Sequence, residues 1–258
     1  LLPPVNGGRV DNRGFEFSFA YNGKFSKDLT FRAGINGGYA KNTVVYMDEA
    51  PGAPDYQKQE GHPIGAYLAY ESTGAFKDEA DIAKNTIDYS GVTSQLIPGD
   101  MKFRDVNGDG KINADDAVRL DKSITPPWNF GATFEMHYKG WDFSFLLQGA
   151  AGAEIRIQTE SGDIGNYLQY DYDHRWTIDN PSDQYPRLAS RGDTYFTGGN
   201  FGFNTYYLRS KDYIRLKNIE VGYNVPLNFL KKYNMSQLRF FVNGLNVFTI
   251  DKNKIFDP

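Results

Sequence analysis

The sequence predicts an all-β fold of antiparallel strands, and a transmembrane β-barrel is the favoured architecture. Of its 258 residues, 16% are aromatic, mostly Phe and Tyr, which favour strands and boundaries between apolar and polar surroundings. Several segments alternate between apolar and polar residues, the pattern of a strand with two different faces. Short and very long connections also alternate along the chain, as they do in outer-membrane barrels.

The first predicted hairpin joins strands at residues 15–21 and 29–35 through a turn rich in Asn, Gly, Ser and Asp. Apolar residues occupy every second position of both strands. Glu16 and Arg32 fall on the polar face, so the hairpin has one apolar and one polar side.

The clearest hairpin lies at residues 130–148. Apolar residues take alternate positions up to Tyr138, and the pattern resumes at Trp141 after the turn Lys139-Gly140. A two-residue turn places Tyr138 opposite Trp141. This register gathers one face of apolar and aromatic side chains, namely Phe130, Ala132, Phe134, Met136, Tyr138, Trp141, Phe143, Phe145 and Leu147. Leu146 is the one apolar residue on the polar face.

Two more strands are predicted at residues 213–225 and 238–247, joined by one helical turn within 226–232. In the first of them the apolar phase shifts near Lys217-Asn218, which predicts a β-bulge or a change of environment. A further strand is a candidate at residues 64–71.

Strands of this kind fit either a membrane barrel, whose apolar face meets lipid, or a soluble sandwich, whose apolar face is the core. The connections within each hairpin are short, whereas those at about 41–127 and 150–210 are very long. All short turns then lie at one end of the strands, which favours the barrel. About eight strands make the smallest membrane barrel, so six strands with one or two further candidates predict either a minimal barrel or one piece of a larger barrel.

Composition excludes several classes of function. The net charge is −4 and no basic stripe is present, so no nucleic-acid partner is expected. The sequence contains no run of about 18 apolar residues, so no membrane-spanning helix is expected. The chain has no Cys, its three His residues lie far apart and no nucleophile is marked, so we expect no enzyme activity.

One motif carries recognisable chemistry, the EF-hand-like loop at residues 105–116. It places oxygen ligands at the spacing that calcium requires, with a glycine, Gly110, at the sharp turn. The predicted ligands are Asp105, Asn107, Asp109, the carbonyl of Lys111, Asn113 and Asp116. Asp116 stands where the motif usually has a bidentate Glu, and its shorter arm weakens the site or admits a water. The expected calcium ion is structural. The alternative is an acidic loop in which the Asn-Gly and Asp-Gly pairs serve only as turns.

Several blocks of sequence resemble the SusC/RagA family of TonB-dependent outer-membrane transporters. In chain order they are Pro4 to Gly8 with Asn12 to Glu16, Pro98 to Arg104 leading into the calcium loop, Tyr138 to Ser144 with Gln148-Gly149, Arg175-Trp176 with Asn180-Pro181 and Tyr185 to Leu188, Tyr213 to Ile219 with Gly222 to Pro226, and Asn243 to Thr249. Their order and spacing span nearly the whole chain.

This resemblance implies the C-terminal segment of a large barrel of about 22 strands with long extracellular loops. It implies import of oligosaccharides or peptides across the outer membrane of Bacteroidetes-type bacteria, together with a SusD-like surface lipoprotein and with energy supplied through TonB. We expect residues 1–258 to be part of the barrel alone, with the plug domain and the TonB-contacting segment outside them.

Within the resemblance, the apolar faces would contact outer-membrane lipid, and Tyr138 and Trp141 would lie in the aromatic girdle on the periplasmic side. Residues 152–210 are rich in Tyr and suit stacking on a substrate or packing against the lipoprotein. The candidate contact residues are Tyr170, Tyr172, Trp176, Tyr185 and Arg187. The alternative is that these aromatic residues pack the loop against itself.

Two other functional classes remain as alternatives. One is a soluble, calcium-braced β-sandwich that acts as a binding or adhesion module, since residues 105–116 also resemble one dockerin repeat. The other is a small self-contained pore. A sandwich would stay in solution without detergent, and a barrel would not.

Overall fold

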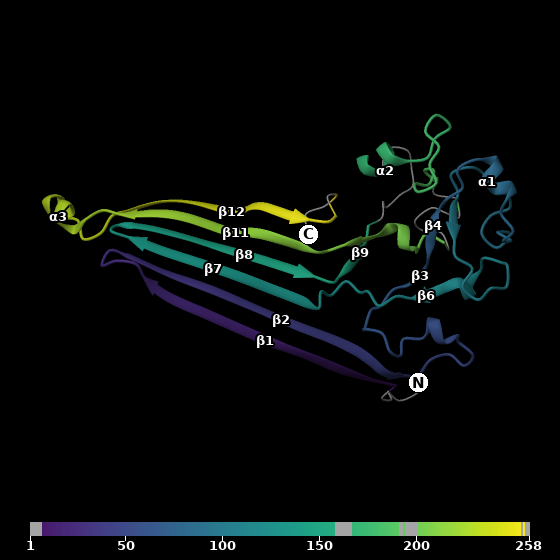
Figure 1. The fold of residues 1–258 in the computed structure, drawn as a ribbon, viewed down its shortest axis with the longest axis horizontal. Coiled ribbons are helices and arrows are strands. Elements are labelled where there is room, and N and C mark those ends of the chain that lie inside the picture. The colour runs from purple at the N-terminus through teal and green to yellow at the C-terminus, as the bar shows by residue number, and fades with distance from the viewer. Residues whose placement is uncertain (1–6, 158–166, 191–192, 194–200, 254, 256–258) are drawn as a thin grey trace, which may run out of the picture. The chain divides into compact units, whose positions relative to one another are not determined.

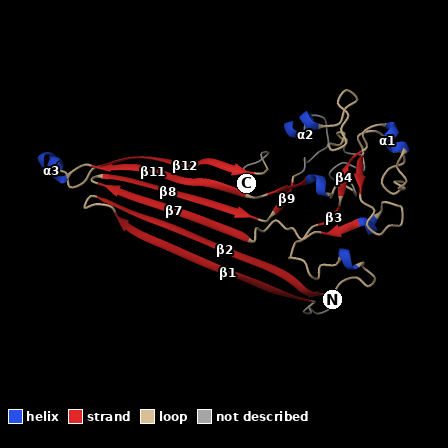
Figure 2. Cartoon of the chain, in the orientation of Figure 1, coloured by secondary structure: helices blue, strands red, loops and turns tan. Residues whose placement is uncertain are grey.

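Six long strands form one antiparallel sheet, in the order β1-β2-β7-β8-β11-β12 (Figures 1 and 2). The figures show a computed structural model, which describes residues 7–157, 167–190, 193, 201–253 and 255. The strands of the sheet are β1 (Gly8–Lys24), β2 (Leu29–Met47), β7 (Trp128–Tyr138), β8 (Trp141–Ala151), β11 (Tyr213–Asn224) and β12 (Arg239–Asp251). The predicted all-β fold is confirmed, and so are its three hairpins. Most of their strands extend beyond the predicted limits, whereas β11 ends one residue before its predicted end and β12 begins one residue after its predicted start.

The chain divides into two compact units. The sheet unit comprises Asn12–Lys41, Ile124–Glu154 and Ser210–Pro258. The loop unit comprises Leu1–Asp11, Asn42–Ser123 and Ile155–Arg209, and so contains most of the two long connections. No described helix is long and apolar enough to cross a membrane.

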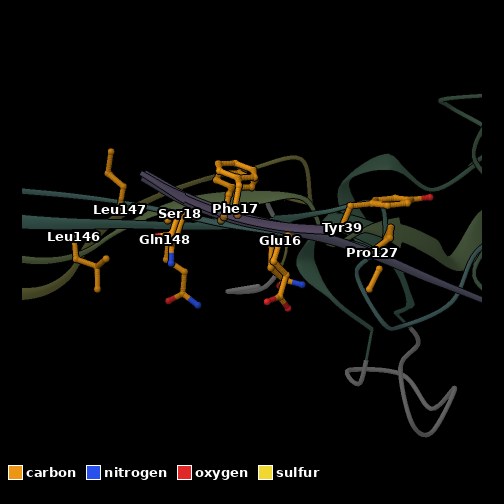
Figure 3. A pocket seen from close by; sticks show the side chains of 16 residues that line it. Glu16, Phe17, Ser18, Tyr39, Pro127, Leu146, Leu147 and Gln148 are labelled. Carbon is orange, nitrogen blue, oxygen red and sulfur yellow. The ribbon is translucent and has the colours of Figure 1, made fainter. Parts of the chain in front are cut away.

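The two faces of the sheet differ as the alternation predicts. Tyr138 pairs with Trp141 across the β7–β8 turn, and Phe134 pairs with Phe145. Phe134 and Phe145 stack with ring centroids 5.6 Å apart. Figure 3 shows Phe17 and Leu147 on one side of the strands and Glu16, Leu146 and Gln148 on the other. The aromatic stripe therefore continues across neighbouring strands, and Leu146 lies among polar side chains, as the sequence indicates.

A β-bulge in β11 keeps the apolar face continuous. The pairing register shifts between Leu216 and Asn218 against both β8 and β12. Leu216 pairs with Leu147 before the shift, and Ile219 pairs with Phe145 after it. Both neighbours belong to the apolar face, so the one extra residue, Lys217, explains the phase change seen in the sequence.

Short turns join the strands of each hairpin, all at one end of the sheet. The β11–β12 connection holds the predicted helical turn, as α3 (Leu227–Leu230) followed by the 3₁₀ turn η4 (Lys231–Tyr233). Asn234 ends this turn in the left-handed conformation, with φ of 54°. Asn tolerates that conformation better than most residues, so the chain can reverse there into β12.

The remaining elements are short. They are the strands β3 (Leu68–Tyr70), β4 (Ser72–Ala75), β5 (Met101–Phe103), β6 (Ala117–Arg119), β9 (Glu154–Arg156) and β10 (Leu208–Ser210), the helices α1 (Glu79–Ala83) and α2 (Gln169–His174), and the 3₁₀ turns η1 (Asp55–Gln57), η2 (Ala114–Asp116) and η3 (Thr205–Tyr207). They form three two-stranded sheets, β3–β6, β4–β5 and β9–β10.

The prediction of one strand over residues 64–71 was wrong. Only Leu68–Tyr70 is a strand there, and it pairs with β6 rather than with the six-stranded sheet. Pro63 and Gly65, the latter with φ of 72°, shape a turn at the start of the segment, where Ala66 N–H donates to the carbonyl of Pro63.

The loop unit has its own hydrophobic core. Buried residues from distant parts of the chain make this core, namely Phe76, Tyr89, Val92, Met101, Phe103, Ile112, Ala189 and Phe201. The Tyr89 hydroxyl accepts a hydrogen bond from Phe103 N–H at 2.9 Å. The core therefore fixes β5 and the loop that follows it.

Candidate functional site

The predicted calcium loop leads from β5 into η2 and β6. Gly108 and Gly110 have φ of 75° and 79°, a conformation that favours glycine. No atom lies within 4 Å of a Cβ added at either position, so the backbone conformation alone requires glycine.

Carboxylates of the loop hold its backbone in place. Asp105 accepts hydrogen bonds from Gly108 N–H at 2.7 Å and from Gly110 N–H at 2.8 Å. Asp116 accepts from Val106 N–H and Asn113 N–H, each at 2.8 Å. Asp116 thereby joins the two ends of the loop and caps η2.

The loop is also tied to the core of the loop unit. Ile112 is 1% exposed and belongs to the core. Its N–H donates to the carbonyl of Asp88 at 2.9 Å, and Asp88 N–H donates to the carbonyl of Gly110 at 2.8 Å. The position of the acidic segment is thus set by backbone bonds and by one buried aliphatic side chain.

The fit of this loop to calcium is mixed. The six predicted ligands lie on one ordered loop and offer hard oxygen donors. Asp116 is fully buried, and no described cation forms an ion pair with it. Against this, the described residues include no group of three or more His, Cys, Asp or Glu placed to hold a metal ion. The oxygens of Asp105 and Asp116 face loop amides instead, so calcium binding stays a prediction.

Of the five candidate contact residues, Trp176 and Arg187 make internal contacts. Trp176 Nε1 donates to the carbonyl of Lys77 at 2.8 Å. Arg187 donates from Nε to Asp100 and from Nη2 to Asp193, both at 2.6 Å. Both residues crowd Gly99, where an added Cβ would lie 2.8 Å from Cβ of Arg187 and 2.9 Å from the indole.

The acid–base pair of Arg187 and Asp100 is largely removed from water. Asp100 is 1% exposed, and burial raises the pKa of its carboxyl, although Ile97 N–H and Arg187 oppose that rise. Burial lowers the pKa of Arg187, but its hydrogen bonds to Asp193 and Asp100 outweigh burial and raise it. The guanidinium is therefore charged and holds two loops together.

The three candidate tyrosines lie on or beside α2. His174 stacks on Tyr170, with ring centroids 4.3 Å apart, and lies 5.0 Å from the ring of Tyr185. Tyr172 is 52% exposed, and the guanidinium of Arg175 lies 3.7 Å from its ring centroid. The structure thus brings Tyr170 and Tyr185 together through His174 and leaves Tyr172 accessible.

Asp100, Asp193 and His174 are partners of the candidate residues that the sequence did not predict. His174 follows Tyr170 by one helical turn, a spacing that could have indicated the stack. Asp100 lies 87 residues before Arg187, and no local pattern connects them.

A pocket in the sheet unit gathers none of these candidates (Figure 3). It occurs where side chains are missing, at Gly37, Gly38, Gly131 and Gly149. The ring of Phe17 lies against Gly37, at 2.7 Å from an added Cβ, and Phe130 covers Gly149. The glycines let aromatic rings of neighbouring strands lie flat on the sheet.

No protein-family model matches the chain. Curated relatives do: "TonB-dependent receptor P3" of Formosa agariphila is 29% identical over 98% of the chain, and "TonB-dependent receptor SusC" of Bacteroides thetaiotaomicron is 23% identical over 98%. The chain spans about a quarter of the length of these relatives, 25% and 24% respectively. Both relatives are named as receptors.

Solved structures of a peptide importer, RagAB, share the fold. The structure of its "closed-closed" state matches 98% of the chain and 27% of its own chain, with a TM-score of 0.68 and 23% identity. The "open-open" state matches 96% of the chain and 26% of its own, with a TM-score of 0.67 and 21% identity. The fold of the chain thus recurs in these structures.

Proposed function

Because the chain belongs to the SusC/RagA family of TonB-dependent transporters, we propose that it is part of an outer-membrane nutrient importer. The observation that carries this proposal is the similarity over nearly the whole chain, in sequence to TonB-dependent receptors and in fold to RagAB. The relatives come from Formosa and Bacteroides, which agrees with the expected source in the Bacteroidetes.

The sheet unit would form part of the barrel wall. Its apolar face would contact lipid, and β1 and β12 are the two edges of the described sheet. An open edge leaves backbone groups without partners in lipid, so neighbouring strands of a longer protein would complete the barrel. That longer protein would also supply the plug domain and the segment that contacts TonB.

The loop unit would lie on the extracellular side. There it would contact the substrate and a SusD-like lipoprotein that closes over the barrel. The substrates would be oligosaccharides or peptides, for which Tyr172 offers an exposed ring on a helix held in place by packed neighbours.

An uptake experiment with the full-length protein tests this function. A strain that lacks the gene should lose uptake of one class in a panel of labelled oligosaccharides and peptides, and the wild-type gene should restore it. Tyr172→Ala should raise the half-saturating substrate concentration roughly fivefold, as expected for the loss of about 1 kcal/mol of stacking.

Tyr46→Ala is the matched control, since Tyr46 is also about half exposed, at 50%. It should leave uptake unchanged. Unimpaired uptake of every panel member in the deletion strain would refute the proposal, and equal effects of the two substitutions would remove Tyr172 from the substrate site.

Calcium binding by residues 105–116 is a second proposed activity. The buried carboxylate of Asp116, which has only amide partners among its described contacts, favours it. In the full-length protein, 1 mM calcium should slow proteolysis within residues 88–119, and chelation should restore the faster cleavage.

Asp105→Asn should abolish the calcium effect, whereas Asp179→Asn, at an exposed position outside the loop, should preserve it. Cleavage rates that do not respond to calcium in the wild-type protein would leave the loop as a turn without a metal.

A further inference from the structure

The three short turns of the sheet share a composition that the importer function does not explain. Each turn combines lysine with exposed aromatic side chains. The turns comprise residues 22–28, 138–141 and 225–238, and we refer to them together as the turn belt.

Backbone hydrogen bonds place the three turns next to one another. Lys139 N–H in the middle turn donates to the carbonyl of Asp28 in the first, at 3.2 Å. Asn224 N–H, at the start of the third turn, donates to the carbonyl of Gly140 at 2.8 Å. The turn belt is therefore one continuous edge of the sheet unit (Figure 1).

The turn belt is basic in an acidic chain. Its charged residues are five lysines and one aspartate, Lys24, Lys27, Lys139, Lys231, Lys232 and Asp28, whereas the whole chain carries −4. All five lysines are exposed, and no ion pair joins them to a carboxylate in the described part of the chain. The nearby acids Asp142 and Glu220 bind Arg239 instead.

The same edge exposes large apolar side chains. Phe25 is 74% exposed, Leu227 58%, Phe229 56% and Tyr233 54%. Leu230 alone is buried in this turn, at 1% exposure, and the rings of Phe229 and Tyr233 lie 5.3 Å apart. Leu230 thus anchors a short apolar projection whose outer side chains stay more than half exposed in the described part of the chain.

We propose that the turn belt binds anionic phospholipid headgroups at the membrane surface, with Leu227 and Phe229 inserted at the boundary of the acyl chains. The charge of the lysines complements phosphate, and long lysine stems reach headgroups while their methylenes cover apolar surface. The belt is also continuous with the apolar face, since Tyr138 and Trp141 belong to both.

This inference rests on the proposed membrane location of the sheet. If the sheet faces lipid, the turn belt at its end lies at the headgroups of one leaflet, the one on the side of the turns. Aromatic residues settle at such interfaces, and lysines near an anionic surface strengthen binding to it.

Lipid titration of the full-length protein tests the proposal. The protein in non-ionic detergent is titrated with dioleoylphosphatidylglycerol or dioleoylphosphatidylcholine, and native mass spectrometry gives the two association constants. The wild-type protein should prefer the anionic lipid by about tenfold or more.

Three variants locate the preference. Lys27→Gln, Lys139→Gln and Lys232→Gln together remove one lysine from each turn and should bring the preference below about threefold. The matched control combines Lys41→Gln, Lys77→Gln and Lys84→Gln, three exposed lysines outside the belt, and should keep it. Leu227→Ser combined with Phe229→Ser should lower the association constants of both lipids by the same factor.

Equal binding of the two lipids, or equal losses in the lysine variant and its control, would overturn the proposal. Stronger competition by soluble polyglutamate than by phosphatidylglycerol would assign the belt to an acidic protein partner and also overturn it. If the protein stays dispersed without detergent, the membrane function itself fails. If it needs detergent but shows no lipid preference, only this inference fails.

Discussion

Arg187 illustrates how a single side chain can stabilise the loop unit. It pairs with a carboxylate that is almost fully buried, and its own backbone N–H donates to the carbonyl of Gly99 at 2.8 Å. Removing one member of such a pair leaves the other charge buried without a partner, which costs more than the pair gains. The residue predicted to contact substrate therefore has a structural role that the sequence alone did not indicate.

Arg187→Ala should lower the free energy of local opening around residues 97–103 and 185–190 by about 3 kcal/mol. Hydrogen exchange of these amides in the full-length protein measures this quantity. The double variant Arg187→Ala with Asp100→Asn should lose less of this free energy than the sum of the two single variants, because the neutral amide no longer needs the guanidinium. Additive losses would show that the two side chains act independently.

Tyr89 should make the loop unit sensitive to alkali. Burial raises the pKa of its hydroxyl to about 12, with Asp116 adding to the rise and a hydrogen bond to Phe103 opposing it. An unfolded tyrosine titrates near 10. The folded state therefore holds the proton more tightly, and the stability that this provides is complete below about pH 10 and is lost between 10 and 12.

Alkaline proteolysis with subtilisin measures that loss. Cleavage of the loop unit should accelerate between pH 10 and 11 in the wild-type protein, as the free energy falls by about 1.4 kcal/mol per pH unit. The Tyr89→Phe variant should be less stable at neutral pH, by about 1 kcal/mol for its lost hydrogen bonds. Its cleavage rate should nevertheless rise less steeply with pH than that of the wild-type protein. Parallel pH profiles of the two proteins would contradict this role.

At the scale of elements, a glycine lets the last three strands be linked by side chains. Arg239 of β12 reaches across Gly222 of β11 to bind Asp142 of β8, and it also binds Glu220. Asn224 adds a hydrogen bond to Asp142 at 3.0 Å. A Cβ at Gly222 would collide with both Arg239 and Asp142. The missing side chain therefore permits an ion pair between strands that are not neighbours.

Gly222→Ala should destabilise this end of the sheet by about 1–3 kcal/mol, the usual cost of overpacking. The measurement is the temperature at which the full-length protein loses its folded mobility in an SDS gel. Gly38→Ala is the control in the same sheet, because the nearest atom, Cγ of the flexible Glu16 side chain, lies 3.3 Å from the added Cβ. Adding Arg239→Ser to Gly222→Ala should restore part of the loss by removing the crowding.

The sequence predicted the elements better than the contacts between them. The alternation around Tyr138 and Trp141 was enough to give the register and the two faces of the hairpin, because a two-residue turn leaves one pairing possible. The packing of the loop unit joins residues as distant as Asp100 and Arg187, and local periodicity carries no information on such pairs. The candidate contact residues were therefore found by composition, and only the structure separates the packed Trp176 from the exposed Tyr172.

At the scale of the whole molecule, the different surroundings of the two sheet faces can be measured directly. The 258 residues contain no Cys, so a single cysteine can carry a spin label at any chosen site of this segment. In lipid nanodiscs, a label at Phe134→Cys should be more accessible to oxygen than to a water-soluble nickel complex. A label at the next residue, Glu135→Cys, should show the opposite preference. The same preference at both positions would exclude a lipid-facing sheet and support the soluble sandwich.

The bulge at Lys217 also has a consequence for how β11 tolerates mutation. In most strands, sensitivity to polar replacement follows one parity of residue number along the whole length. In β11, the sensitive positions should be even before the bulge, at Ile214 and Leu216, and odd after it, at Ile219, Val221 and Tyr223. A complete substitution scan would thus show two rhythms out of step by one residue. Deleting Lys217 should merge them into one, because Leu216, Asn218 and Ile219 would then be consecutive and face the consecutive residues Leu147, Leu146 and Phe145 of β8.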